Sequence, residues 1–272
     1  MKIFFLGATK FSSRCMRVAI DAGCSIVGCA GSPEVFPISY APKGVRNINY
    51  FDFQASAHDL GVPCVPYQRD AVKEFIHEVE RLEPDLILVA GWYYMVPRAL
   101  REVAKKGAVG LHGSLLPKYR GGAPLVWALI HGESELGLSL FYLEDGVDTG
   151  DIIGQERFRI SEHETIADAM KKMEDAAERL LITYLPLLAK DKAPRLPQDH
   201  SQATQFPQRS PQDGEIDWKK TPKEIRDFIR AQTKPYPGAF STMDGRKITI
   251  WDADVEFVQS TQKPAAKGDI AA

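Results

Sequence analysis

Residues 2–30 read KIFFLGATKFSSRCMRVAIDAGCSIVGCA, and they carry the clearest fold signal in the chain. The apolar run 2–6 ends at Gly7, which is typical of a buried parallel strand. We expect a helix to open at Ala8–Ser13 and to stop at Gly23, and Ser25–Ala30 to form a second strand. This order predicts the first unit of a doubly wound sheet. No Gly-x-Gly-x-x-Gly follows the first strand, so a nicotinamide dinucleotide is not expected.

The elements that follow extend the same architecture. We expect apolar strands and helices to alternate up to about residue 190. The expected strands are 62–65, 86–90 and 137–143, followed by a strand pair at 151–155 and 156–160. The expected helices are 71–82, 97–105 and one from Ser161 onward. Ser161 is the expected N-cap of the last helix, because Glu164 stands three residues later. The sequence therefore predicts an α/β fold: a doubly wound, mostly parallel sheet in a catalytic domain over residues 1–190.

Two segments fall outside this alternation. Residues 31–53 form a long loop with three prolines and five aromatic residues, and we give a structural flap and a substrate-binding role equal weight. Residues 191–214 are rich in proline and glutamine, which predicts a linker or an extended arm.

A smaller unit is expected over residues 215–272. It should contain a helix at Thr221–Arg230 and a β-hairpin that turns at Asp244-Gly245. The last residues, Ser260–Ala272, are small and polar and should fray. The unit is either small or cut short.

Two pieces of sequence point to a single active site. Residues 109–124 read VGLHGSLLPKYRGGAP and place His112 at the end of a predicted strand, beside a loop that carries Lys118 and Arg120. Residues 144–151 read EDGVDTGD and follow another predicted strand. Catalytic residues often lie on such loops above a rigid scaffold. The acids of the second piece are either part of the site or solvated turn formers.

Together, the pattern His-x-Ser-Leu-Leu-Pro-x-Tyr-Arg-Gly-x-x-Pro and the later Gly-x-Asp-Thr-Gly resemble the folate-dependent formyltransferase family. That family includes sugar-amine N-formyltransferases, methionyl-tRNA formyltransferase and the hydrolase domain of formyltetrahydrofolate dehydrogenase. The resemblance extends from Met1 to about Val258, and the residues Tyr93-Tyr94 and Leu111-His112-Gly113-Ser114 look more like the aminoarabinose formyltransferase domain than the hydrolase. It implies a Rossmann-like fold and transfer of a formyl group from 10-formyltetrahydrofolate to a primary amine, with no metal.

The resemblance also implies catalytic roles. His112 matches the general base and Asp148 matches its carboxylate partner and proton relay, while the family's asparagine position is occupied by Gly110. Since Gly110 has no side-chain donor, a backbone N–H group or a water replaces the amide, or the chain is an altered transferase, or it is a hydrolase.

Further residues are assigned to binding. Those expected to hold the folate lie after the strand 86–90 and in the second piece: Trp92, Tyr93, Met95, Val96, Asp145 and Val147. The aromatic residues among them could equally pack under the next helix. Those expected to bind the amine substrate are Lys10, Ser114, Lys118, Tyr119 and Arg120, although Lys118 and Arg120 could equally be solvated.

Composition limits the partners. The formal net charge of −2 and the pI of about 6.3 argue against a general affinity for nucleic acid. The four cysteines fit no zinc pattern and should be reduced, and no signal or membrane-spanning run is present, which predicts a cytoplasmic protein. We therefore expect a small amine, first a nucleotide-linked amino sugar. The alternatives are methionyl-tRNA formyltransferase, a 10-formyltetrahydrofolate hydrolase and a non-catalytic folate-binding homologue. A homodimer is left open.

Overall fold

The computed structural model describes residues 1–38 and 41–256, and its core is a six-stranded sheet in the order β2-β1-β5-β6-β8-β9. The first four strands in this order are parallel to one another, whereas β8 pairs in antiparallel fashion with both β6 and β9. The predicted α/β class, with a mostly parallel sheet, is confirmed. The strands are β1 (Lys2–Gly7), β2 (Ser25–Gly31), β5 (Leu86–Ala90), β6 (Ala108–His112), β8 (Glu135–Tyr142) and β9 (Ile152–Arg159).

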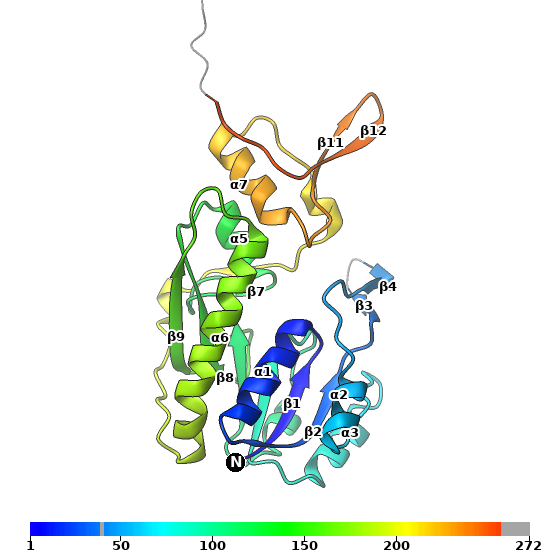
Figure 1. The fold of residues 1–272 in the computed structure, drawn as a ribbon, viewed down its shortest axis with the longest axis vertical. Coiled ribbons are helices and arrows are strands. Elements are labelled where there is room, and N and C mark those ends of the chain that lie inside the picture. Colours follow the sequence, from blue (N-terminus) through cyan, green and yellow to red (C-terminus); the bar gives the residue numbers. More distant parts are fainter. Residues whose placement is uncertain (39–40, 257–272) are drawn as a thin grey trace, which may run out of the picture.

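Helices cover both faces of the sheet (Figure 1). On β1, Ile3 and Phe5 face a core shared with α1, α2 and α6, while Phe4 and Leu6 face a second core with α3 and α4. Because successive side chains of a strand point to opposite faces, an unbroken apolar run is required here. The helices are α1 (Lys10–Asp21), α2 (Phe53–Leu60), α3 (Val72–Glu80), α4 (Arg98–Arg101), α5 (Pro124–Ile130), α6 (Ile166–Ala189) and α7 (Pro222–Gln232).

The start of α1 is tied to the central strand β5. Thr9 is the N-cap, and its side chain and that of Ser12 form a reciprocal capping box. The Ser12 hydroxyl also donates to the backbone oxygen of Ala90 over 2.6 Å. A side chain at Gly91 would strike this pair, because its Cβ would lie 2.7 Å from Thr9 Oγ1, and its φ is +59°. The carboxyl ends of β1 and β5 are thereby held together.

Four local predictions were wrong. The expected strand 62–65 is a single parallel bridge between Cys29 and Cys64. The loop 31–53 contains an antiparallel hairpin, β3 (Val35–Ile38) and β4 (Ala41–Arg46), which is too short to leave a periodic pattern in the sequence. The expected strand pair at 151–160 is the one strand β9.

The fourth error concerns the start of α6. Thr165 is its N-cap, because Asp168 completes a capping box with Thr165. Ser161 and Glu164 do form the expected backbone contact, 2.7 Å from Ser161 N to Glu164 Oε2, but in the turn that precedes the helix. Two capping signals stand four residues apart, and the later one starts the helix.

The C-terminal unit lies at one end of the sheet (Figure 1). It contains α7 and the hairpin of β11 (Ala239–Met243) and β12 (Arg246–Ile250), as expected. Ala231 of α7 packs in one core with Leu129 of α5 and Ile166 of α6. The buried Arg230 donates to the backbone oxygens of Ser161 and Glu164, which fastens α7 to the start of α6. The residues expected to fray, Ser260–Ala272, lie outside the described part.

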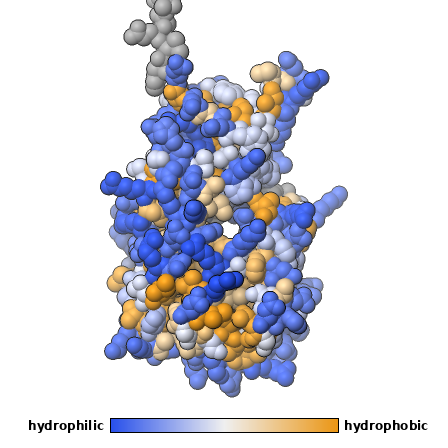
Figure 2. Space-filling view, in the orientation of Figure 1, coloured by the Kyte–Doolittle hydropathy of each residue, from blue (hydrophilic) through white to orange (hydrophobic). Residues whose placement is uncertain are grey.

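The arm 191–214 crosses back over the catalytic unit. Its short strand β10 (Gln205–Phe206) pairs in parallel with β7 (Arg120–Gly121), and it also contains the 3-10 turns at His200–Gln202 and Pro211–Gly214. The face shown in Figure 2 is mostly hydrophilic, with apolar patches in its lower half. Among the described residues, no helix is long and apolar enough to cross a membrane.

Candidate active site

His112 and Asp148, which the sequence places in separate pieces, meet at the carboxyl end of β6. His112 Nδ1 lies 3.5 Å from Asp148 Oδ2, and the two side chains are only 10% and 20% exposed. His112 is the last residue of β6, whereas Asp148 lies on the loop between β8 and β9. In that loop Asp148 has a φ of 52°, a backbone conformation that residues other than glycine adopt uncommonly.

The ring of His112 is oriented by a backbone contact. Its Nε2 lies 2.7 Å from the backbone oxygen of Tyr119. A carbonyl oxygen can only accept, so Nε2 carries the proton and a neutral ring has its lone pair on Nδ1. Nδ1 is the nitrogen that faces Asp148. The arrangement thus presents a base beside a carboxylate that would stabilise its protonated form.

Asp148 is held by two residues besides His112. Its Oδ2 accepts a 2.8 Å hydrogen bond from the backbone N–H of Gly121, which follows the His112 loop. Gln198 of the arm donates from Nε2 to the backbone oxygens of Asp148 and Gly150, over 2.9 and 2.7 Å. These contacts fix the carboxylate and the unusual backbone conformation at the same time.

Arg120 continues this network. Its guanidinium donates from Nε and Nη2 to Gln198 Oε1, and Nη2 also lies 3.0 Å from His200 Nδ1. Arg120 is 6% exposed, so the alternative that it is solvated was wrong. The arm fills the space in which we expected free solvent.

The other residues expected to bind the amine divide into two groups. Ser114 and Tyr119 are engaged within the protein: Ser114 Oγ donates to Lys118 O over 2.6 Å, and Tyr119 OH donates to Glu133 Oε1 over 2.8 Å. Burial and the Glu133 carboxylate both raise the pKa of Tyr119. Lys10 and Lys118 are exposed. These two lysines are the members of the predicted set whose charges face solvent.

The space beside Gly110 is filled by another side chain. A Cβ at Gly110 would lie 2.9 Å from Leu143 Cδ2 and 3.4 Å from Phe141 Cε1. Gly110 and His112 are two residues apart on β6 and therefore face the same side of the sheet. Leu143 consequently occupies the room that an amide side chain would need beside His112.

The residues expected to hold the folate follow β5. Trp92 and Val96 are partly buried against the core that contains Val89 and Leu100, and Leu143 joins them there. Tyr93 is 42% exposed, stacks on Phe36 of the β3–β4 hairpin at 4.6 Å between ring centroids, and donates to Asn47 Oδ1 over 3.2 Å. Met95 is 65% exposed. Leu143 packs in the same core as Trp92 and Val96, and the loop that carries Asp148 begins just after it. The residues after β5 and this loop are therefore neighbours.

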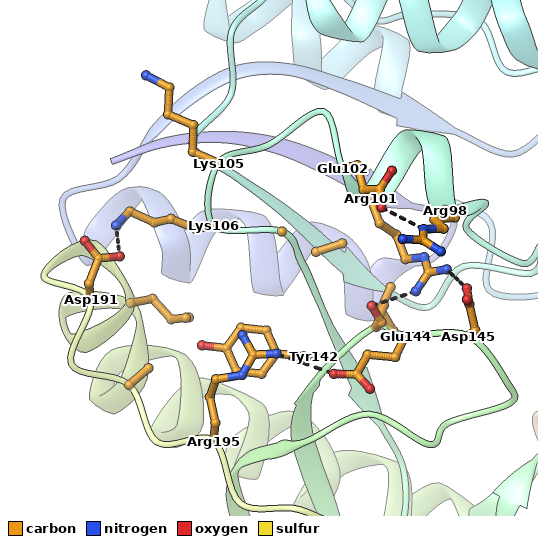
Figure 3. A pocket seen from close by; sticks show the side chains of 15 residues that line it. Arg98, Arg101, Glu102, Lys105, Lys106, Tyr142, Glu144, Asp145, Asp191 and Arg195 are labelled. Atoms are coloured by element: carbon orange, nitrogen blue, oxygen red, sulfur yellow. Dashed lines mark hydrogen bonds and ion pairs between the residues drawn. The ribbon is translucent and has the colours of Figure 1, made fainter.

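Arginines hold the start of the Asp148 loop from its outer side. Arg101 pairs with Asp145 and also donates to Leu143 O over 3.0 Å (Figure 3). Arg195 lies over the Tyr142 ring and forms an ion pair with Glu144. A cavity of about 710 Å³ opens between these residues and Lys106. Asp145 is therefore engaged by Arg101, and Val147 is half-buried next to Asp148.

Gln198 is the site residue that the sequence did not indicate. It is 6% exposed, and it lies in the proline- and glutamine-rich arm, where nothing distinguishes it from the neighbouring glutamines. Residues 196–206 have the bridge of Leu196 to Ile152 and the short strand β10, but these pairings are too brief to leave a periodic pattern. In the part of the chain that is described, no group of three or more His, Cys, Asp or Glu residues could hold a metal ion.

Comparisons with known proteins identify the family of the chain. The family model described as formyl transferase matches residues 44–185, and the model of the formyl transferase C-terminal domain matches residues 209–272. The chain is 33% identical to a methionyl-tRNA formyltransferase of Alkaliphilus oremlandii over 255 residues, which is 94% of this chain and 80% of the relative.

Solved structures share the fold at lower identity. A 4-N formyltransferase from Francisella tularensis superimposes with a TM-score of 0.72 at 18% identity, covering 94% of this chain and 98% of the other. An N-formyltransferase from Helicobacter canadensis, in complex with folinic acid and dTDP-3-aminofucose, gives a TM-score of 0.67 at 19% identity, covering 91% and 86%.

Proposed function

The chain is a formyltransferase that belongs to the formyl transferase family, and we propose that it transfers a formyl group from 10-formyltetrahydrofolate to the primary amine of a nucleotide-linked amino sugar. The observation that carries the transfer chemistry is the unprotonated Nδ1 of His112 beside Asp148. The substrate class we propose is therefore a small amine.

His112 is assigned as the general base. An amine that attacks a formyl carbon must lose a proton as the new C–N bond forms, and imidazole accepts protons near neutral pH. Nδ1 is available for that proton because Nε2 donates to Tyr119 O. Asp148 then stabilises the charged ring and relays the proton to the folate nitrogen, which leaves as its bond to the formyl carbon breaks.

Gly110 supplies no side-chain donor to the oxyanion that develops on the formyl group. A backbone N–H group or a water takes over this role in our proposal, because Leu143 closes the place of an amide. A donor that is held less rigidly than an asparagine amide stabilises the oxyanion less, so we expect a slower enzyme than relatives with asparagine at this position, by up to about the hundredfold that one such donor is worth.

The residues after β5 and at the start of the Asp148 loop fit a flat heterocycle. Trp92, Val96 and Leu143 offer apolar surface, and they adjoin the catalytic pair through the loop 143–148. We assign backbone groups in 92–96 and the carboxylate of Asp145 as hydrogen-bonding partners for the ring nitrogens of the folate. The Helicobacter canadensis enzyme, which shares the fold, was solved with folinic acid. The family resemblance supports 10-formyltetrahydrofolate as the formyl donor.

Charge supports the small amine. The chain has a net charge of −2, and in the β3–β4 hairpin Arg46 is paired with Glu34, Nη2 to Oε1, at 2.7 Å. That hairpin therefore offers little free positive charge for a polyanion. The exposed Lys10 and Lys118 suffice for the one or two phosphates of a nucleotide sugar. We further propose a cytoplasmic location, since all four cysteines are free thiols.

Methionyl-tRNA formylation is the second candidate. It is favoured by the 33% identity to the Alkaliphilus oremlandii relative, which spans 94% of this chain. The C-terminal unit also presents Lys247 over the Phe240 ring and an exposed Trp218, residue types that contact nucleic acids.

One experiment separates the candidates. The protein is incubated with 10-formyltetrahydrofolate and with either a panel of nucleotide-linked amino sugars or methionyl-initiator tRNA, at low and at high salt. We expect formylation of an amino sugar with a weak salt dependence. Formylation of the tRNA, with binding that weakens steeply as salt rises, would replace the first candidate by the second. Loss of the formyl group without any amine would identify a hydrolase, and no turnover at all would leave a folate-binding protein.

A further inference from the structure

Cys29 and Cys64 are neighbours across an edge of the central sheet. Cys29 lies on the edge strand β2, and Cys64 forms an isolated parallel bridge with it. The backbone N–H of Cys29 donates to Pro63 O over 3.0 Å, and Val65 N–H donates to Cys29 O over 2.8 Å. Two residues bridged in this way have Cα atoms about 5 Å apart, within the range that a disulfide spans, and their side chains point to the same face.

The two side chains are close enough for each to shift the pKa of the other, and the backbone N–H of Gly31 also favours a thiolate on Cys64. Cys29 is fully buried and its Sγ also lies 3.8 Å from the backbone oxygen of Phe53, while Cys64 is half-buried. Cys64 therefore has both the access to solvent and the donors that stabilise a thiolate, and Cys29 is placed directly behind it.

Electrostatics favour Cys64 as the reactive sulfur. The hydrogen bond from Cys29 lowers the pKa of Cys64 to about 7, in spite of its partial burial and the nearby Asp52 carboxylate. The same contact, together with burial, raises the pKa of Cys29. Burial also raises the pKa of Cys15 and of Cys24, so these two thiols are protonated at neutral pH.

We propose that Cys29 and Cys64 form a reversible disulfide site that reacts with a low-molecular-weight disulfide. The Cys64 thiolate attacks one sulfur of that disulfide, a new S–S bond forms, and one small thiolate leaves. Cys29 then loses its proton to solvent and attacks Cys64 Sγ, which releases the second small thiolate. The two protein thiols are oxidised and the small disulfide is reduced to two thiols.

The cysteine pair is separate from the catalytic pair, because β1 and β5 lie between β2, which carries Cys29, and β6, which carries His112. It lies where β2 passes into the β3–β4 hairpin, since Gly31 ends β2 and also donates to Cys64. Oxidation would tie residues 63–65 covalently to the sheet, in place of the single bridge and its two hydrogen bonds.

The test uses the full chain, reduced and desalted under nitrogen. It is incubated with glutathione disulfide at neutral pH, blocked with N-ethylmaleimide, digested and examined by mass spectrometry. We expect a Cys29–Cys64 cross-linked peptide, two of the four thiols lost, and full reversal by dithiothreitol. Alkylation of all four cysteines, or glutathione distributed among them without a cross-link, would overturn the proposal.

Variants test the order of the steps. In Cys29→Ala the glutathione adduct should accumulate on Cys64, because no second thiol can displace it. In Cys64→Ala neither product should form, since Cys29 is buried. Cys24→Ala is the matched control and should cross-link like the unmodified chain. An adduct on Cys29 in Cys64→Ala, or none on Cys64 in Cys29→Ala, would contradict the assignment of Cys64 as the attacking sulfur.

Discussion

Gln198 holds Asp148 from a segment fifty residues further along the chain: its side-chain nitrogen lies 2.9 Å from the backbone oxygen of Asp148. The same nitrogen reaches Gly150 O at 2.7 Å, and the Gln198 oxygen accepts from the buried guanidinium of Arg120. Arg120 precedes Gly121, whose N–H binds the Asp148 carboxylate. The arm therefore joins the His112 loop to the Asp148 loop, and it is part of the candidate active site.

Replacing Gln198 should slow the reaction without weakening substrate binding. In Gln198→Ala the Asp148 backbone loses its anchor, and a displaced catalytic group costs about a hundredfold in rate. We expect kcat to fall roughly tenfold to a hundredfold and KM for both substrates to stay within about twofold. Steady-state kinetics, with circular dichroism to verify folding, measure this.

Two further variants separate positioning from a general loss of stability. Gln198→Glu retains an acceptor for Arg120 but lacks the donor to Asp148, so it should lower kcat as Gln198→Ala does. Gln212 lies exposed in the same arm, and Gln212→Ala should leave kcat unchanged. A fully active Gln198→Glu protein would mean that Gln198 supports Arg120 only.

His112 and Asp148 should behave as one unit. We expect His112→Ala and Asp148→Ala each to lower kcat by about three orders of magnitude, and the double variant to be little slower than either, because each residue serves the same proton transfer. His58→Ala is a surface control, since the His58 side chain is 91% exposed. Losses that multiply in the double variant would show that the two residues act independently.

Much of the fold could be predicted from the sequence because burial leaves a periodic pattern. The run 2–6 lies between two helical layers, so every side chain of β1 from Ile3 to Leu6 is fully buried and apolar. The loops that carry His112 and Asp148 could be located because glycine and proline mark them, whereas these two residues were singled out by the resemblance to the formyltransferase family. Both signals are local in sequence.

What could not be predicted depends on contacts between distant segments. The β3–β4 hairpin and the Cys29–Cys64 bridge involve too few residues to give a period, and Gln198 resembles any surface glutamine until Arg120 and Asp148 surround it. The error at Arg120 has the same origin. A cation in a loop is expected in solvent, and only the arm that covers it makes it buried.

The reactivity of Cys64 should depend on pH through its lowered pKa. Its thiolate fraction rises as pH rises through about 7, so alkylation by iodoacetamide should reach half its maximal rate near that pH. In Cys29→Ala the main cause of the lowering is removed, and the midpoint should move up toward that of a free thiol, about 8.5. Rates at Cys64 are followed by peptide mass spectrometry. A midpoint that does not move between the two proteins would mean that Cys29 has no influence on Cys64.

An asparagine side chain at position 110 should fit only if the neighbouring Leu143 side chain is made smaller. In Gly110→Asn the new Cβ would lie 2.9 Å from Leu143 Cδ2, so the single variant should be less stable, by about 1–3 kcal/mol for an overpacked core site. Leu143→Ala removes the obstructing methyl groups but leaves a gap in the core shared with Trp92 and Val96. The double variant fills that gap with the asparagine side chain.

We therefore expect Gly110→Asn/Leu143→Ala to melt at a higher temperature than Leu143→Ala and to have a kcat at least about tenfold higher, since one added oxyanion donor is typically worth a hundredfold. Thermal unfolding and single-turnover formyl transfer are measured on all four proteins of the cycle. Gly110→Ser/Leu143→Ala is the size control, because its shorter hydroxyl fills less of the gap and reaches less far. If Gly110→Asn/Leu143→Ala recovers stability but not rate, the oxyanion already has all its hydrogen bonds in the natural chain. In that case another donor has replaced the asparagine amide, and no oxyanion donor has been lost.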